Sequence, residues 1–158
     1  MSSDFEMLLG QVRSQREMLF KLVTGLKPDQ WNFQPYSHLN SIHSTLVHLL
    51  IVDRATVVKV EDGMSFDWDS MVTDQERNAS PDELITLLKT SLSNVIQFLE
   101  TNFGSKTLDA PFLMFGSTKP VGAAICSLSE EYAYHNGQVS YLRQASDTDW
   151  DYYTALYS

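Results

Sequence analysis

The sequence predicts an all-α protein, an antiparallel four-helix bundle, and three observations lead to this prediction. Four long stretches carry apolar residues at alternating steps of three and four, the spacing that gathers side chains on one face of a helix. None shows the strict alternation of a half-buried strand. Short stretches rich in Pro, Gly, Asn and Ser separate them. The length of 158 residues fits one domain of ordinary size, so we expect residues 1–158 to form a single domain.

The first helix is expected over residues 4–26. Ser3 and Glu6 have the spacing of a capping box at its start, and Gly25 and Pro28 are typical of its end. Gln15 is the one polar break in its apolar face. That face consists of Phe5, Leu8, Val12, Leu19, Leu22 and Leu26.

The second helix follows a proline-containing connection, residues 27–40, which Trp31 and Phe33 are expected to hold against the bundle. The helix should begin at Asn40 or Ser41 and run to about Glu61, with Gly63 ending it. Its buried face is predicted to contain Ile42, Leu46, Leu49, Val52 and Val60.

The third helix begins with a strong signal. Ser80 can cap it, Pro81 suits the first helical position, and Glu83 completes a capping box. Gly104 should end it, and its buried face is predicted to contain Ile85, Leu88, Leu92, Val95 and Leu99. Residues 64–79 before it have no clean period and form a long connection, with room for a short helical turn. A connection of this length can cross over the bundle, so we predict an up-down-down-up order of the helices.

The last helix should run from Pro120 to about Ala145. Its buried face steps without a break through Val121, Ile125, Leu128, Tyr132, His135, Val139 and Leu142. Residues 107–118 before it are aromatic-rich and fit a loop or a small hairpin. The tail, residues 147–158, is rich in Trp and Tyr and is expected to pack back onto the bundle.

Composition narrows the classes of partner. The 11 basic and 20 acidic residues give a net charge of −9, which disfavours binding to nucleic acid or to an anionic membrane surface. Cys126 is the only cysteine, so no intramolecular disulfide can form, as is usual in a reducing cytoplasm. The start of the chain lacks the basic residues of a signal peptide, and the densest apolar run, residues 46–52, is too short to span a bilayer. We therefore expect a cytoplasmic protein.

One set of residues has the spacing of a metal site. Glu131 and His135 lie four residues apart on the last helix, which places their Cβ atoms about 6 Å apart on one side of it. His48 lies on the second helix among small side chains that leave room around it. Two imidazoles and one carboxylate would leave coordination positions open, as in catalytic metal sites, and would suit Zn, Ni or Fe(II).

Plainer interpretations of the same residues stay open. A histidine on an apolar helix face is more often a core residue than a ligand, and Glu131 can be a solvated surface residue. Asp53 and Arg54, one turn beyond His48, could assist a reaction, but a solvated ion pair is the more ordinary role.

Three stretches of the chain resemble the DinB-like (DinB/YfiT-like) superfamily of metal-dependent enzymes. Residues 25–35, Gly-Leu-Lys-Pro-Asp-Gln-Trp-Asn-Phe-Gln-Pro, look like the link between its first two helices. Residues 41–50, Ser-Ile-His-Ser-Thr-Leu-Val-His-Leu-Leu, are similar to its second helix. Residues 131–138, Glu-Tyr-Ala-Tyr-His-Asn-Gly-Gln, look like its fourth-helix motif, His-x-x-x-His-x-Gly-Gln.

The resemblance implies an up-down-down-up bundle in which three histidines hold a divalent metal, commonly within a homodimer. By position, His48 and His135 match two of the ligands. Glu131 replaces the third histidine, either as a harder ligand or as the mark of a degenerate, empty site. Gly137 and Gln138 match the Gly-Gln of the motif, which implies a close helix approach at Gly137 and a ligand-orienting role for Gln138.

Two hypotheses of function follow. The first is a mononuclear enzyme that depends on a divalent metal (Zn, Ni, Fe or Mn) and acts on an unknown small molecule. Some members of the superfamily activate a low-molecular-weight thiol for transfer, and others are described as hydrolases, so the resemblance implies one of these two types. The second is a non-catalytic dimeric bundle with a degenerate metal site, binding a small molecule or a protein partner.

Overall fold

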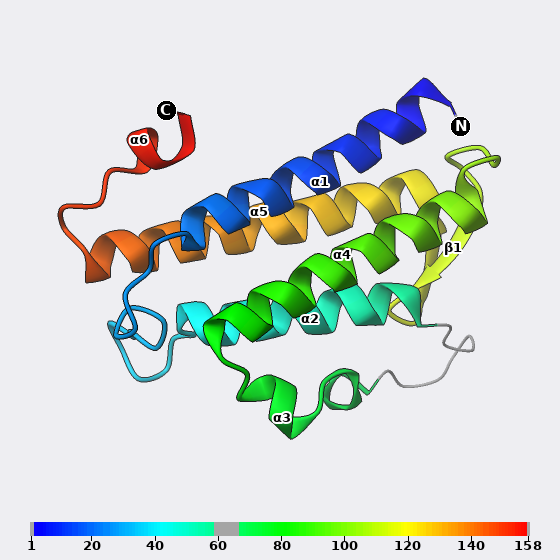
Figure 1. The fold of residues 1–158 in the computed structure, drawn as a ribbon. Coiled ribbons are helices and arrows are strands. Elements are labelled where there is room, and N and C mark those ends of the chain that lie inside the picture. The colour runs from blue at the N-terminus through cyan, green and yellow to red at the C-terminus, as the bar shows by residue number, and fades with distance from the viewer. Residues whose placement is uncertain (1, 59–66, 158) are drawn as a thin grey trace.

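Four long helices dominate the computed structural model, which describes residues 2–58 and 67–157 (Figure 1). They are α1 (Ser3–Val23), α2 (Ile42–Val57), α4 (Pro81–Phe103) and α5 (Val121–Ser146). The shorter elements are η1 (Asp69–Met71), α3 (Asp74–Arg77), β1 (Pro111–Met114), β2 (Ser117–Pro120) and α6 (Tyr152–Tyr157). The prediction of four long helices is confirmed, and the protein is mainly helical with one small hairpin.

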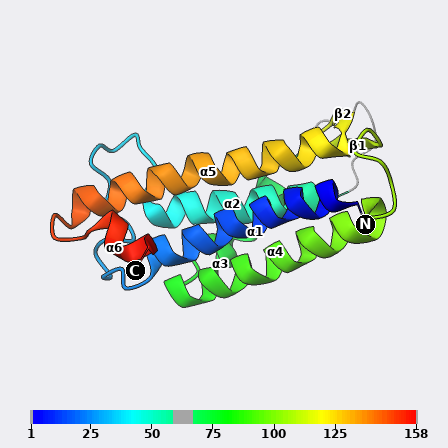
Figure 2. The ribbon, with the colours of Figure 1, turned by 90° about the horizontal axis from the view of Figure 1, so that it is seen from above.

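The long helices pack side by side as a helical bundle. Helix α1 lies along α5, and α2 lies along α4 and also contacts α5, as two views at right angles show (Figures 1 and 2). The predicted apolar faces of α2 and α5 are buried at every predicted position that the structure describes, from Ile42 to Val52 and from Val121 to Leu142. Among the described residues, no helix is both long enough and apolar enough to cross a membrane.

Helix α1 differs from its prediction at both ends. Its N-cap is Ser2, whose side chain accepts a hydrogen bond from Phe5 N, so the expected capping box of Ser3 and Glu6 does not form. The helix ends at Val23, before the predicted Leu26. Thr24 is extended, and Gly25 takes a φ of +72°, a left-handed conformation that glycine adopts readily.

The polar residue inside the apolar face of α1 is Arg16, not Gln15. Arg16 follows Val12 by four residues and precedes Leu19 by three, and its side chain is fully buried. Helix α4 is shifted in a similar way, because its buried face includes Leu84 and Ser91, while the predicted Ile85 and Leu92 are only half-buried.

The ends of α2 and α4 follow their caps. Ser41 forms a capping box with Ser44 at the start of α2, and Ser80 forms the predicted capping box with Glu83 at the start of α4. Helix α2 ends at Val57 because Val58 is extended, earlier than the predicted end. Three residues that entered the prediction for this helix lie outside the described residues: Val60, Glu61 and Gly63.

The connections behave largely as predicted. Trp31 is buried and Phe33 is half-buried against the core, and the connection after α2 contains two short helical turns, η1 and α3. Strands β1 and β2 form a hairpin around Phe115 and Gly116, whose φ values of 55° and 75° are those of a type I′ turn. The tail returns to α1, where Lys21 Nζ donates to the carbonyl oxygen of Leu156 over 3.1 Å.

Candidate metal centre

His48, Glu131 and His135 converge where α2 faces α5. Glu131 Oε1 lies 3.0 Å from His48 Nε2 and 3.0 Å from His135 Nε2. One ligand atom from each residue can be chosen so that all three lie within 4.8 Å of one another. The structure thus brings together side chains that are far apart in the sequence, since His48 and Glu131 are separated by 83 positions.

The positions of the three residues on α2 and α5 explain why they converge. Glu131 and His135 lie one turn apart on α5 and therefore share a face, and α2 presents His48 to that face. The side chains of His48 and Glu131 are 41% and 38% exposed, while that of His135 is 8% exposed. The cluster is therefore open to solvent on one side, and His135 forms its inner wall.

The spacing of the ligand atoms fits one metal ion. Two atoms that are each about 2.1 Å from a tetrahedral ion lie about 3.4 Å apart. The two contacts of 3.0 Å are close to that separation, so small side-chain movements would admit an ion. Two imidazole nitrogens and one carboxylate oxygen are a ligand set that suits a divalent transition metal and leaves further coordination positions open.

The electrostatics of the cluster favour an ionised carboxylate. Partial burial raises the pKa of Glu131, but the hydrogen bonds and charges of His48 and His135 outweigh burial and lower this pKa below its usual value. Glu131 is therefore a carboxylate at neutral pH, which is the form that binds a metal ion.

Gln138 contacts the cluster from behind. Its Oε1 atom lies 2.7 Å from His135 Nδ1 and accepts a hydrogen bond from the N–H group at that position. Both ring nitrogens of His135 then face oxygen atoms, although a neutral imidazole carries only one proton. A second proton or a cation is needed on the Nε2 side, which is the side of Glu131. Gly137 lies on the exposed side of α5, and a Cβ atom added there would meet nothing within 4 Å, so no other helix in the described part of the chain approaches it closely.

A second polar cluster lies in the core and was missed by the sequence prediction. Asp53 is fully buried and accepts hydrogen bonds from Arg16, Ser91 and Tyr132. The Arg16 guanidinium lies 2.5 Å from Asp53 Oδ1 and 4.1 Å from the centre of the Tyr132 ring. Burial raises the pKa of Asp53, and the charge of Arg16 opposes that rise. We call these four residues the buried cluster.

The expected solvated ion pair is therefore wrong for Asp53, because its pair with Arg16 is fully buried. Arg54 does form a partly exposed ion pair, with Glu76 of α3, in which Nη2 lies 2.5 Å from Oε1. The signal for the buried cluster was present in the sequence, because Arg16 occupies a core position of the α1 face. His43 does not join the metal centre, and its Nε2 atom lies 3.0 Å from the carbonyl oxygen of Ala79.

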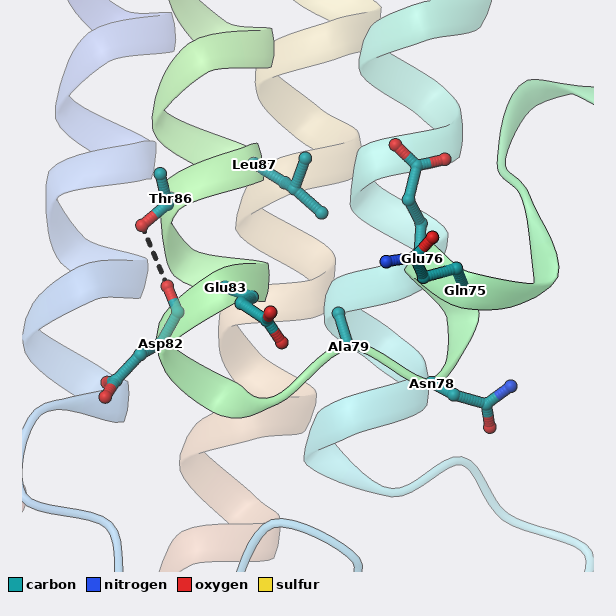
Figure 3. Close-up of a pocket in the computed structure, with 8 residues that line it drawn as sticks. All are labelled: Gln75, Glu76, Asn78, Ala79, Asp82, Glu83, Thr86 and Leu87. Carbon is teal, nitrogen blue, oxygen red and sulfur yellow. Dashed lines mark hydrogen bonds between the residues drawn. The ribbon is translucent and has the colours of Figure 1, made fainter.

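A wide groove of about 520 Å³ lies elsewhere, between α3 and the start of α4 (Figure 3). Two of its three carboxylates already have partners, since Glu76 pairs with Arg54 and Glu83 accepts hydrogen bonds from Ser80. None of the three converging residues lines it. The size of this groove therefore does not make it the centre of the chemistry.

Comparison with known proteins identifies the family. The family whose description is mycothiol-S-transferase matches residues 7–148, most of the chain and all three residues of the cluster. No curated protein and no solved structure matches the chain. The chain belongs to the mycothiol-S-transferase family, which is part of the DinB/YfiT-like metal-dependent superfamily.

Proposed function

We propose that the protein is a metal-dependent S-transferase that joins a low-molecular-weight thiol of the mycothiol type to a small electrophile. His48, Glu131 and His135 would hold one divalent cation. The single observation that carries the proposal is the convergence of their three ligand atoms within 4.8 Å, in a chain of the mycothiol-S-transferase family. The proposal includes one domain with the up-down-down-up helix order of the superfamily.

The side chains of the proposed site would have different roles. A bound divalent cation supplies positive charge that favours the thiolate form of a thiol near neutral pH. Glu131 contributes one negative charge, so this site carries less net positive charge than one with three histidines. His135 keeps its Nε2 atom directed at the centre because Gln138 accepts a hydrogen bond from the Nδ1–H group. The exposed sides of His48 and Glu131 leave room for the thiol and the electrophile to approach.

The test is the metal content of protein purified without chelators. We expect about one equivalent of a divalent metal in the wild type and a clear loss in Glu131→Ala. Glu130→Ala is the matched control, because Glu130 is an exposed neighbour outside the cluster. Equal metal content in the wild type and in Glu131→Ala would remove Glu131 from the site.

One observation favours a second candidate, a non-catalytic bundle with a degenerate site. The carboxylate of Glu131 lies within hydrogen-bond distance of both imidazoles, so the three groups can satisfy one another without an ion. Wild-type protein that takes up no Zn, Ni, Mn or Fe(II) would favour this candidate over the enzyme. The homodimer and the cytoplasmic location stay predictions of the sequence.

A further inference from the structure

A separate groove lies at the end of the bundle where α4 ends and the hairpin begins (Figure 1). It has a volume of about 320 Å³ and includes Val58, the C-cap of α2. Val58 follows His48 by ten residues, which corresponds to about 15 Å along a helix, so the groove is distinct from the metal centre. We call it the hairpin groove. Its lining also includes Phe98, Asn102, Phe103, Lys106, Phe112 and Leu113.

The floor of the hairpin groove is aromatic. Phe103 and Phe112 are buried, and the centres of their rings lie 4.9 Å apart. The half-buried ring of Phe98 contacts both, with its centre 5.8 Å from that of Phe112 and 6.3 Å from that of Phe103. The planes of these rings are inclined to one another by 44° to 68°, and aromatic rings prefer such arrangements to a face-to-face sandwich. A ring of a ligand can join the cluster in the same way.

The backbone fixes the shape of this groove. Gly104 caps the C-terminal end of α4, and Lys106 N donates to the carbonyl oxygen of Phe103 over 2.9 Å, so the chain turns back toward the Phe103 ring. Strand β1 then pairs with β2, which places Phe112 opposite Lys119. A groove that is formed before binding loses less entropy when its ligand arrives.

Lys106 places a positive charge at the edge of the aromatic floor. Its Nζ atom lies 4.9 Å from the centre of the Phe103 ring, and the residue is exposed. In the part of the chain that the structure describes, no carboxylate forms an ion pair with Lys106. Asn102 donates from Nδ2 to the carbonyl oxygen of Phe98 over 2.7 Å, so part of its hydrogen-bonding capacity is already used. The ammonium group of Lys106 is therefore the main polar group that the groove offers to a ligand.

This charge sets the hairpin groove apart in a chain with a net charge of −9. Its lining contains one lysine and neither aspartate nor glutamate. Three other grooves contain carboxylates, for example those of Glu76, Asp53 and Glu17. A fourth contains His38 but neither lysine nor arginine. Among these five grooves, the hairpin groove is thus the one whose formal charge attracts an anion at neutral pH.

We propose that the hairpin groove binds a small aromatic carboxylate. The ring of the ligand packs with Phe98, Phe103 and Phe112, and its carboxylate pairs with the ammonium group of Lys106. The volume of the groove lies at the small end of the range for ligand pockets, which suits a molecule with one ring and a short acidic chain. The site lies apart from the metal centre, so the proposal does not rest on the proposed function.

The test is a titration of the full-length protein with 3-phenylpropionate, followed by NMR. The neutral analogue is 3-phenylpropanol, the cationic analogue is 3-phenylpropylamine, and propionate lacks the ring. We expect saturable shifts of the Leu113 methyl signals and of the Lys106 backbone amide, with 3-phenylpropionate binding most tightly. Binding of any analogue as tight as that of 3-phenylpropionate, or no saturable shift with 3-phenylpropionate, would overturn the proposal.

Variants locate the binding. Lys106→Gln should weaken the binding of 3-phenylpropionate about tenfold, the effect of losing one hydrogen bond to a charged group, and should leave that of 3-phenylpropanol unchanged. Lys89→Gln is the matched control, because Lys89 Nζ also lies over a phenylalanine ring, 5.5 Å from the centre of Phe20, but outside the groove. Both lysines are exposed, so neither variant should unfold the protein. Equal affinities for 3-phenylpropionate in the wild type and in both variants would contradict the assignment.

A comparison with and without zinc separates this proposal from the proposed function. Carboxylates also bind metal ions, so the titration is carried out on the zinc-treated protein and on the chelator-treated protein. We expect the same affinity for 3-phenylpropionate in both. Binding that requires zinc and shifts the ring signals of His48 and His135, but not the Leu113 methyl signals, would place the ligand at the metal centre and overturn the proposal. Binding in the hairpin groove by protein that takes up no zinc would support the groove and contradict the metal-dependent function.

Discussion

Helices α2 and α5 contribute to two polar clusters, and the two differ in how completely their atoms are enclosed. At the metal centre, Glu131 is 38% exposed and shares its oxygen with two histidines. In the buried cluster, Asp53 is fully enclosed and has donors from three other helices. Glu131 and Tyr132 are neighbours in the chain, yet one belongs to each cluster. One helix can therefore hold an open reactive group beside a closed structural one.

The difference in enclosure predicts a difference in what each cluster does. Removing one partner of a buried ion pair leaves a charge with no solvent, whereas an exposed pair contributes little to stability. The buried cluster should therefore govern folding, and the metal centre should govern ligand binding. Variants in the two clusters test whether stability and ligand binding are divided in this way.

The largest effect is expected from Asp53→Ala. It leaves the Arg16 guanidinium without its carboxylate in the core, and we expect a loss of about 3–5 kcal/mol in the free energy of unfolding. Denaturation with urea would measure it. The double variant Arg16→Met, Asp53→Leu removes both charges and should recover much of the loss. A loss below about 1 kcal/mol in Asp53→Ala would place the pair in an exposed or hydrated setting.

Gln138→Leu should weaken metal binding about 10- to 100-fold while it leaves the three ligands in place. The reason is that Leu cannot accept the hydrogen bond from His135 Nδ1–H, so the orientation of the ring is lost. Metal affinity measured by competition with a chelator gives the readout, and Gln144→Leu, an exposed change on the same helix, is the control. An unchanged affinity would show that Gln138 does not orient the ligand.

The ion pair of Arg54 and Glu76 lies between the two extremes of burial. Hydrogen bonds from Arg54 lower the pKa of Glu76 to about 2, below its ordinary 4.5. A lowered carboxyl pKa stabilises the folded state above pH 4.5, and this contribution is lost as the pH falls through about 2. After allowance for solvent screening we expect about 1 kcal/mol between wild type and Glu76→Gln at pH 6, shrinking toward zero near pH 2. Urea denaturation at several pH values would measure this difference, and a difference independent of pH would contradict it.

The smallest effect on stability is expected from Glu131→Ala in the absence of metal. Its contacts are half-exposed, so the free energy of unfolding should change by less than about 1 kcal/mol. Comparison of its unfolding curve with that of Asp53→Ala tests the division directly. A loss as large as that of Asp53→Ala would mean that the metal centre is also a folding element.

The sequence predicted the elements better than their ends. Apolar periodicity over many residues identifies a long helix, but its last turn depends on caps and connections. Ser2 capped α1 in place of Ser3, and Val58 ended α2 early. The three residues of the metal centre could be predicted because Glu131 and His135 share a local spacing and because His48 and His135 match ligand positions of the superfamily, with Glu131 in the place of its third histidine.

The buried cluster could not be predicted in the same way. The partner of Asp53 lies on another helix, 37 positions away, and no local pattern specifies such a pairing. Arg16 interrupts an apolar face, so its burial could have been inferred, but not its partner.

Crystals of the protein soaked with zinc would test the metal centre most directly, through anomalous scattering recorded at the zinc absorption edge. We predict one strong peak about 2.0–2.2 Å from the Nε2 atoms of His48 and His135 and from a carboxylate oxygen of Glu131. A peak bound by other residues, or no peak among these three, would contradict the proposed role of the cluster.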